Sequence, residues 1–180
     1  MKTCIALFRG INVGGRNSLP MKELAALLEG LGARKVRTYI QSGNAAFDYA
    51  GGDFARLRGR LASAVMGRRG FAPEVLILTL ADLEKAMEGN PFPEAETEPA
   101  TLHLGFLAST PTAPDLKKFE ALKAPGERYR LTRRVFYLHA PDGFGKSKLA
   151  AGAEKAIGVP MTVRNWRTVC AIGAMARERA

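Results

Sequence analysis

The sequence predicts a mixed α/β protein whose two halves repeat one order of strands and helices. Short apolar runs typical of buried strands alternate with segments that carry apolar residues at helical spacing. The order of these elements in the first half recurs in the second half. At 180 residues and 47% hydrophobic content, the chain can bury a normal core as one domain or as two small packed halves. A wholly disordered chain is therefore excluded.

The first half begins with the apolar run 3–8, which predicts a buried strand. Leucines at i, i+3, i+4 and i+7 over residues 24–31 then predict a helix. Pro20 suits the first turn of this helix, and Gly32 suits its left-handed C-terminal cap.

A hairpin, a second helix and a fourth strand complete this half. Residues 36–40 and 45–49 predict the hairpin, because the Ser-Gly-Asn between them is typical of a turn. Apolar residues at helical spacing predict a helix over 54–65, and residues 75–80 predict the strand. The resulting order, strand, helix, strand, strand, helix, strand, is that of the split βαβ or ferredoxin-like arrangement.

A connector and a second half follow. Thr79 and Asp82 have the spacing of a capping box, which predicts a short helix through Met87 that ends before the Asn-Pro-Phe-Pro at 90–93. The later elements are a strand over 102–107, a helix over 116–122, a hairpin over 128–131 and 135–138, a helix over 149–157, a strand over 161–163 and a last helix from about 165 to 177. We therefore expect two ferredoxin-like halves with antiparallel sheets, 1–80 and 101–180 with its C-terminal helix, joined by an acidic helical connector over 81–100.

The formal net charge is +10, and it is unevenly distributed. Residues 1–73 carry 12 basic and 4 acidic side chains, residues 74–99 carry 1 and 7, and residues 100–180 carry 14 and 6. Two basic blocks of +8 therefore flank a connector of −6. A basic surface attracts phosphate backbones and releases their counterions, which favours a polyanionic partner. Compositional drift, with arginine scattered over solvated faces, explains the charge about equally well.

Several classes of protein are not indicated. No apolar run approaches the roughly 18 residues of a membrane-spanning helix, and residues 1–8 lack the features of a signal peptide. Cys4 and Cys170 lie far apart, without CxxC spacing or a histidine cluster, so neither a disulfide framework nor a zinc site is predicted. We expect a cytoplasmic protein with no cofactor and no membrane partner.

Glycine, asparagine and arginine are concentrated in four polar segments: 9–17, 41–44, 143–148 and 164–167. Loops held by a rigid scaffold often carry function. In the predicted topology, the strands that precede the first two segments run in one direction, and the same holds for the last two. We therefore expect two pairs of neighbouring segments. Docking of the halves could merge the pairs into one cleft, because ligand sites favour domain boundaries.

The first segment lies between a predicted strand and a predicted helix. Its candidate ligand-binding residues are Arg9, Gly10, Asn12, Gly14, Gly15 and Asn17. Glycine and asparagine tolerate positive φ and let backbone N–H groups approach an anion. The glycines lack GxGxxG spacing, so a dinucleotide site is not indicated. A plain strand-to-helix turn is about as well supported as ligand binding, and Arg9 and Arg16 favour binding.

The second segment places Gln41, Ser42 and Asn44 at the same end of the predicted sheet. Their amide and hydroxyl groups are candidate ligand contacts, although a plain hairpin also needs Gly43 and Asn44. Ser42 has no evident acid–base partner that would make it a nucleophile. His103 and His139 fall in predicted strands, where we expect ordinary hydrogen-bonded histidines.

The third segment resembles a P-loop, because Gly145, Lys146 and Ser147 stand between a strand and a helix, but Ala140 replaces the first glycine. A P-loop ATPase also needs a parallel sheet and a further acid for magnesium, so nucleotide hydrolysis is not indicated. Anion binding by Lys146, Ser147, Lys148 and the helix N-terminus is better supported. The alternative is a helix cap with solvated lysines.

In the fourth segment, Asn165 suits the N-cap of the last helix, and Trp166 and Arg167 follow it. Core packing of Trp166 is the simpler interpretation. An aromatic residue between Arg164 and Arg167 can instead stack on a base while the arginines hold its phosphate.

The same residues resemble those of a known family. Residues 7–15, 37–44, 90–92, 145–149 and 164–168 are similar to motifs of the bacterial family called domain of unknown function 1697, and the resemblance covers nearly the whole chain. It implies a compact α/β protein of two ferredoxin-like halves. It implies no activity.

We expect a binding protein for a phosphate-bearing ligand, a nucleotide or a nucleic acid, held by the polar segments. The alternative is an enzyme acting on a small phosphorylated or acidic metabolite, with amide side chains and loop N–H groups as charge stabilisers. A protein-interaction module is a third possibility. It predicts that the largest exposed apolar patch lies away from the four segments.

Overall fold

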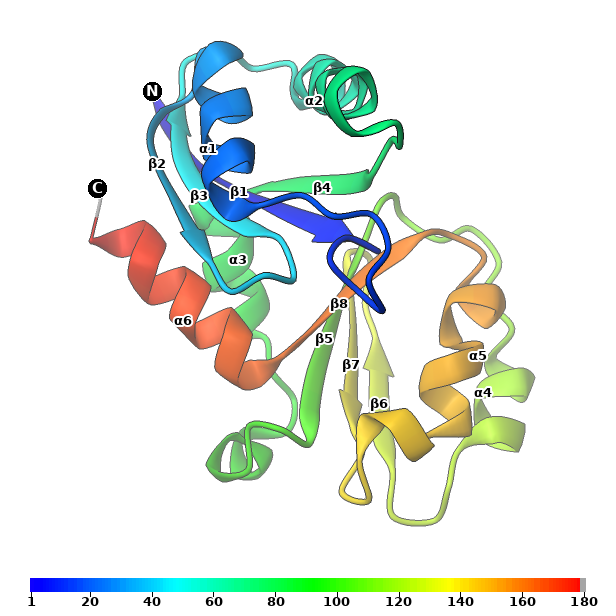
Figure 1. The fold of residues 1–180 in the computed structure, drawn as a ribbon. Coiled ribbons are helices and arrows are strands. Elements are labelled where there is room, and N and C mark those ends of the chain that lie inside the picture. Colours follow the sequence, from blue (N-terminus) through cyan, green and yellow to red (C-terminus); the bar gives the residue numbers. More distant parts are fainter. Residues whose placement is uncertain (179–180) are drawn as a thin grey trace. The chain divides into compact units, whose positions relative to one another are not determined.

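The computed structural model describes residues 1–178, which form two four-stranded antiparallel sheets and their helices (Figure 1). By its internal contacts the chain divides into one unit of Met1–Lys85 with the residues from Ala171 onward, and a second unit of Ala86–Cys170. The division falls inside α3 (Leu80–Glu88) and α6 (Trp166–Arg177). None of the described helices combines the length and the apolar character needed to cross a bilayer.

The first unit has its strands in the order β2-β3-β1-β4, which is the ferredoxin-like order. Because β1 and β2 are both antiparallel to β3, they share a direction. Its elements are β1 (Lys2–Arg9), α1 (Met21–Gly30), β2 (Arg34–Tyr39), β3 (Asn44–Tyr49), α2 (Phe54–Arg69) and β4 (Glu74–Thr79). The predicted order and fold class of this half are confirmed.

The core of this unit lies between its sheet and its two helices. On β1, Cys4, Ala6 and Phe8 share one face, since side chains alternate along a strand. They pack with the apolar stripes of α1 and α2, the latter made of Leu57, Leu61 and Val65. Ile5 and Leu7, on the other face of β1, are also fully buried, so both faces of the sheet are covered.

Local signals set the ends of the helices. Gly32, just beyond α1, has the predicted positive φ, +95°. At the start of α3 the predicted capping box forms: the Asp82 N–H donates to Thr79 Oγ1 (3.1 Å) and the Thr79 N–H donates to Asp82 Oδ2 (3.0 Å). The strand predicted to reach Leu80 therefore ends at Thr79, because the capped helix begins at Leu80.

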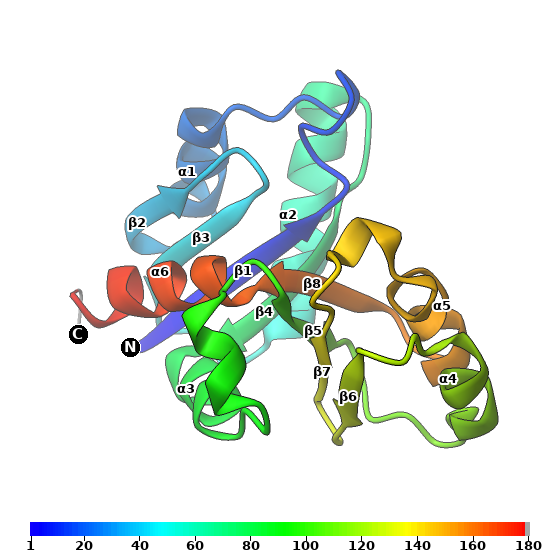
Figure 2. The ribbon, with the colours of Figure 1, turned by 90° about the horizontal axis from the view of Figure 1, so that it is seen from below.

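The second unit repeats the order of the first, with strands arranged β6-β7-β5-β8. Its elements are the 3₁₀ turn η1 (Pro93–Thr97), β5 (Leu102–Leu107), α4 (Leu116–Leu122), β6 (Arg128–Leu131), β7 (Val135–His139), the 3₁₀ turn η2 (Phe144–Lys146), α5 (Lys148–Ile157) and β8 (Met161–Asn165). Helices α4 and α5 lie together on one side of this sheet (Figure 2), where Phe119 and Leu149 are fully buried against Phe136 and Leu138.

Predicted strand and helix boundaries in this unit differ from the structure by one or two residues, and the largest difference is at the end of β8. Strand β8 continues to Asn165 instead of ending at Val163, because Asn165 still pairs with His103 of β5. Helix α6 follows at once, and the Thr168 N–H donates to Asn165 Oδ1 (2.9 Å). Asn165 therefore ends a strand and caps a helix, as an N-cap residue with extended backbone can.

Candidate functional site

Two of the polar segments meet at one end of the first sheet. We call residues 9–17 and 40–44 together the β1–β2 rim. The Phe8 N–H donates to Gly43 O at 2.8 Å, which ties the end of β1 to the turn after β2. The prediction that these segments are neighbours is confirmed, and its cause is the shared direction of β1 and β2.

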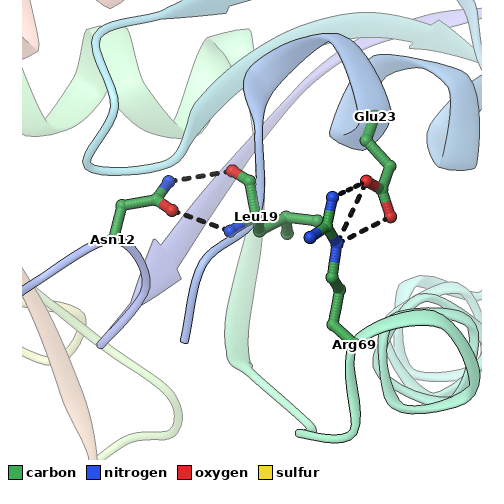
Figure 3. Close-up of polar contacts among 4 residues, drawn as sticks. All are labelled: Asn12, Leu19, Glu23 and Arg69. Atoms are coloured by element: carbon green, nitrogen blue, oxygen red, sulfur yellow. Dashed lines mark hydrogen bonds and ion pairs between the residues drawn. The ribbon is translucent and has the colours of Figure 1, made fainter. Parts of the chain in front are cut away.

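The side chain of Asn12 holds the two segments together. Its Nδ2 donates to Leu19 O and to Gln41 O, both at 2.8 Å, and its Oδ1 accepts from the Leu19 N–H at 2.7 Å; Figure 3 shows the contacts with Leu19. Both amide hydrogens are thus engaged within the chain. Asn12 braces the rim, and its side chain does not point a spare donor at a ligand.

The first segment has a fixed shape of its own. The Asn12 N–H donates to Asn17 O and the Arg16 N–H donates to Val13 O, each at 3.1 Å, so the chain folds back as a small hairpin. Positive φ at both central residues, Gly14 (+59°) and Gly15 (+73°), is typical of a type I′ turn. Asn17 Nδ2 also donates to Gly10 O at 2.9 Å. The loop is therefore pre-shaped.

The second segment is packed tightly beneath the first. At Gly43, where φ is +83°, an added Cβ would lie 2.5 Å from Ile11 Cδ1 and 2.6 Å from Phe8 Cβ. Only glycine fits there. Asn44 is fully buried, and its Nδ2 donates to Tyr39 O (3.0 Å) and Ser42 Oγ (3.1 Å). Asn44 and Ser42 thus stabilise the turn.

The outer surface of the rim carries a mixture of groups. Arg16 and Gln41 are exposed, and Arg9 forms a 3.2 Å ion pair with Glu74. Within residues 1–178, the N–H groups of Gly14 and Gly15 donate to no acceptor in the chain. The rim therefore offers cations, an amide and open backbone donors at one surface.

Two apolar side chains also stand out from this surface. Val13 is 65% exposed and Ile40 is 49% exposed. Ile40 was predicted to end an extended strand, but its φ is +48°. A β-branched residue in the left-handed region is strained, and such strain tends to occur at functional sites. Sequence reasoning missed both residues, because a strand pattern carries no signal for a single residue with positive φ.

The third and fourth segments also begin at one end of their sheet. Strands β7 and β8 are both antiparallel to β5, and their last residues, His139 and Asn165, pair with the neighbouring Leu102 and His103. The ring of Phe144 stacks on His103 with 4.2 Å between centroids. The predicted pairing of these two segments is confirmed within the second unit.

In the third segment, Ser147 is an N-cap. Its Oγ accepts from the Ala150 N–H at 2.9 Å, and the residue is 7% exposed. Lys146 and Lys148 on either side are exposed. The sheet that precedes this segment is antiparallel, and the hydroxyl is used by the helix, so the segment does not form a P-loop.

In the fourth segment, the groups divide between core and surface. Trp166 is 7% exposed and belongs to the core, so its ring does not offer a face to a base. Arg167 is exposed. Arg164 Nη1 donates to Val163 O at 2.9 Å, and burial lowers the pKa of its guanidinium to about 10. Arg167 is therefore the cation of this segment that faces solvent.

His103 differs from the ordinary hydrogen-bonded histidine that was expected. Its Nδ1 is buried and has no hydrogen-bond partner among the described residues. Burial lowers its pKa to about 4, although a hydrogen bond with the backbone of Thr101 acts in the opposite direction. The ring is therefore neutral near pH 7. Within residues 1–178, no three His, Cys, Asp or Glu side chains are grouped to hold a metal ion.

Comparison with known proteins agrees with the fold. The signature of the family described as "Protein of unknown function (DUF1697)" matches residues 1–137. The solved structure of the conserved bacterial protein SP0830 from Streptococcus pneumoniae is similar to this chain, with a TM-score of 0.72 and 27% sequence identity. The match covers 97% of this chain and 98% of that one. No match was found among curated proteins.

Proposed function

The chain belongs to the family of proteins of unknown function DUF1697, and we propose that it binds a phosphate-bearing ligand, a nucleotide or a nucleic acid, at the β1–β2 rim. The observation that carries this proposal is the bracing of the rim by Asn12, which holds the loop and the turn in one arrangement before any ligand arrives. A pre-shaped site binds without the free-energy cost of ordering a loop.

The polar groups of the rim suit a phosphate. The open N–H groups of Gly14 and Gly15 and the guanidinium of Arg16 are the donors that phosphate oxygens accept from. Arg9 contributes a second cation, part of whose charge Glu74 offsets. Gln41 adds an exposed amide for a sugar or a base edge.

The apolar groups suit the rest of a nucleotide. Val13 and Ile40 lie on segments that Asn12 joins, and both are exposed next to the phosphate-binding donors. Contact of a base with Ile40 would remove apolar surface from water. This contact also gives a reason for retaining a strained residue at an exposed position.

We include the exposed cations of the second unit among the proposed phosphate-binding groups. Lys146 and Lys148 flank the capped N-terminus of α5, and Arg167 is exposed in the first turn of α6. Ser147, Asn165 and Trp166 support these elements from within.

The competing functions make different demands. An enzyme needs an acid or base at the rim, and Glu74, the acid that contacts Arg9, is held in an ion pair. An interaction module predicts exposed apolar groups away from the polar segments. Val13 and Ile40 instead lie in the β1–β2 rim, and Met1, Met66 and Leu116 are exposed elsewhere. The proposal includes a cytoplasmic location, and in agreement with it Cys4 and Cys170 are not joined by a disulfide.

The test is calorimetric titration of the full chain at low salt with inorganic phosphate, AMP, ATP and short oligonucleotides. We expect saturable binding that Arg16→Ala weakens for every phosphate compound. Ile40→Gly should weaken AMP more than inorganic phosphate, because only AMP carries a base. Arg133→Ala, which removes an exposed cation of the second unit, is the charge-matched control. Absence of binding for all four probes would overturn the proposal.

A further inference from the structure

Helix α2 carries several arginines, and only Arg69 among them forms an ion pair within residues 1–178. It contains Arg56, Arg58, Arg60, Arg68 and Arg69, and no acidic residue. Arg69 reaches across to α1, where its Nε lies 3.1 Å from both carboxylate oxygens of Glu23 (Figure 3). Arg56, Arg58 and Arg60 are exposed, and no ion pair among the described residues involves them.

Arg56 lies on the side of α2 that faces away from its core. The helix packs through Leu57, Leu61 and Val65. At about 100° per residue, Arg56 projects about 140° from the middle of this stripe, whereas Arg60 and Arg58 lie on the two opposite flanks of the helix. We call these three residues the α2 basic face.

The α2 basic face is unfavourable for the helix that carries it. Arg56 and Arg60 are like charges at i and i+4, a spacing that destabilises a helix. They also lie in its first two turns, near the positive end of its dipole, where acidic residues are favoured. Within residues 1–178 no ion pair offsets this repulsion, so these charges remain available to a partner outside the chain.

Several side chains between the arginines are small, and Met66 on the same side is 48% exposed. Gly59, Ser63 and Gly67 share the outer side of α2 and are exposed, and an added Cβ at either glycine would meet nothing within 4 Å. Neither glycine has a positive φ. No contact or backbone conformation inside the chain therefore requires glycine at these positions. Small residues allow the extended backbone of a bound polymer to approach the helix axis closely. The arginines could then contact this backbone from both sides.

We propose that the α2 basic face binds the sugar–phosphate backbone of a nucleic acid without reading its sequence. Charge complementarity points to this polymer, because three cations without ion-pair partners within residues 1–178 can each replace a condensed counterion on a phosphate. Contacts with phosphates position a protein on nucleic acid but do not distinguish bases. This surface is separate from the β1–β2 rim and goes beyond the function proposed for it.

The experiment measures fluorescence anisotropy of a labelled DNA duplex and a labelled RNA strand, each about 20 nucleotides long, across about 50 to 200 mM KCl. The variant is the triple substitution Arg56→Ala, Arg58→Ala, Arg60→Ala. The matched control removes three exposed cations of the second unit by Lys117→Ala, Arg133→Ala, Arg134→Ala. Each lost phosphate contact lowers the slope of log K against log salt by about 0.9 on duplex DNA, so we expect the α2 variant to lose about 2 to 3 in slope. Its affinity at the lower salt should fall at least about tenfold, uniformly across sequences.

A second variant tests the close approach without changing charge. Gly59→Gln with Gly67→Gln fills the outer side of α2 and should weaken polymer binding several-fold, while circular dichroism reports that the helix is retained.

Equal salt slopes for the α2 variant and its control would overturn the proposal. Equal binding of poly-glutamate would also overturn it, because the surface would then recognise any polyanion. Titration of AMP separates the two sites: loss of AMP binding in Arg16→Ala and its retention in the α2 variant show that the rim and α2 act independently.

Discussion

At the scale of single residues, the polar side chains of the β1–β2 rim divide into those that build it and those that face solvent. Asn12, Asn17 and Asn44 direct their amides to backbone carbonyls, whereas Arg16 and Gln41 are exposed. Asparagine suits the first role because it tolerates positive φ and hydrogen-bonds nearby backbone. A motif can therefore mark a site while some of its residues only shape it.

Replacement of Asn12 by Ala should destabilise the first unit. The change removes three hydrogen bonds, leaves Gln41 O without this donor, and places Ala at a φ of +54°. We expect a loss of about 2 to 4 kcal/mol in the free energy of unfolding. Urea titration followed by circular dichroism measures it. Ser18→Ala, at an exposed neighbouring position, is the control and should change stability by less than about 0.5 kcal/mol. Similar midpoints for the two variants would show that Asn12 does not brace the rim.

Replacement of Ile40 by Gly should have opposite effects on stability and on binding. Glycine adopts a φ of +48° without the clash of a β-branched side chain, so the free energy of unfolding should rise by about 1 kcal/mol. Affinity for AMP should fall, because the exposed apolar contact is lost. Thermal unfolding and calorimetry measure the two quantities. A variant that is less stable than the parent would contradict the assignment of strain to Ile40.

His103 should make the protein less stable in mild acid. Its pKa is lowered from 6.5 to about 4, so the folded state favours the neutral ring more than the unfolded state does. This contribution is complete above about pH 6.5 and is lost as the pH falls towards 4. Its size is on the order of 3 kcal/mol. Unfolding midpoints of the parent and of His103→Phe should therefore converge or cross between about pH 7 and pH 4. Parallel pH profiles would argue against a buried neutral histidine.

At the scale of elements, α2 combines a well-defined core stripe with an outer side that contains two glycines. Asp53 caps its start, where its Oδ1 accepts from the Arg56 N–H at 2.8 Å, and Gly70 ends it with a φ of +75°. Between these caps, Gly59 and Gly67 have neither a positive φ nor a neighbour that excludes a side chain. Their presence lowers helix stability without a reason inside the chain.

Gly59→Ala and Gly67→Ala should each stabilise the protein, by about 0.5 to 1 kcal/mol, because alanine restricts the unfolded chain and favours the helix. Gly43→Ala should instead destabilise the protein. Its Cβ would lie 2.5 Å from Ile11 Cδ1 at a φ of +83°, so a loss of more than about 2 kcal/mol is expected. Differential scanning fluorimetry ranks the three variants. If either α2 variant melted below the parent, α2 would have a packing constraint that its open surroundings do not reveal.

At the scale of the whole molecule, the acidic connector offsets part of the basic charge locally. Within the first unit, Arg177 Nε lies 2.8 Å from Glu84 Oε1, and within the second, Arg128 forms an ion pair with Glu94 and lies over the ring of Phe92 at 4.8 Å. These pairs are largely exposed, and exposed pairs contribute little to stability. Repulsion among the remaining cations therefore acts on the folded state.

Salt should stabilise the protein at neutral pH. Raising KCl from about 10 to about 150 mM shortens the screening length from about 30 to about 8 Å and weakens the repulsion behind the net charge of +10. We expect the melting temperature to rise by a few degrees. Phosphate at the same ionic strength should raise it further, since a bound ligand stabilises the folded state. Equal effects of chloride and phosphate would argue that no site prefers phosphate.

The order of elements was predictable because it depends on local patterns. Strands and helices follow from apolar periodicity, and the Thr79–Asp82 box and the Asn165 cap follow from the spacing of side chains that satisfy nearby N–H groups. The ferredoxin-like order implies which strands share a direction. The meeting of residues 9–17 with residues 41–44 therefore followed from the sequence as well.

Only the tertiary structure decided which side chains are buried, which groups they hydrogen-bond and which residues are strained. It directed both amide hydrogens of Asn12 into the chain and buried Ser147 and Trp166. Among the described residues, it left Arg56, Arg58 and Arg60 without ion pairs and His103 Nδ1 without a hydrogen-bond partner. It also set the positive φ of Ile40. The reason is physical. Periodicity reports on neighbours one turn or two residues away, whereas burial, hydrogen-bond partners and strain depend on atoms brought close from distant parts of the chain.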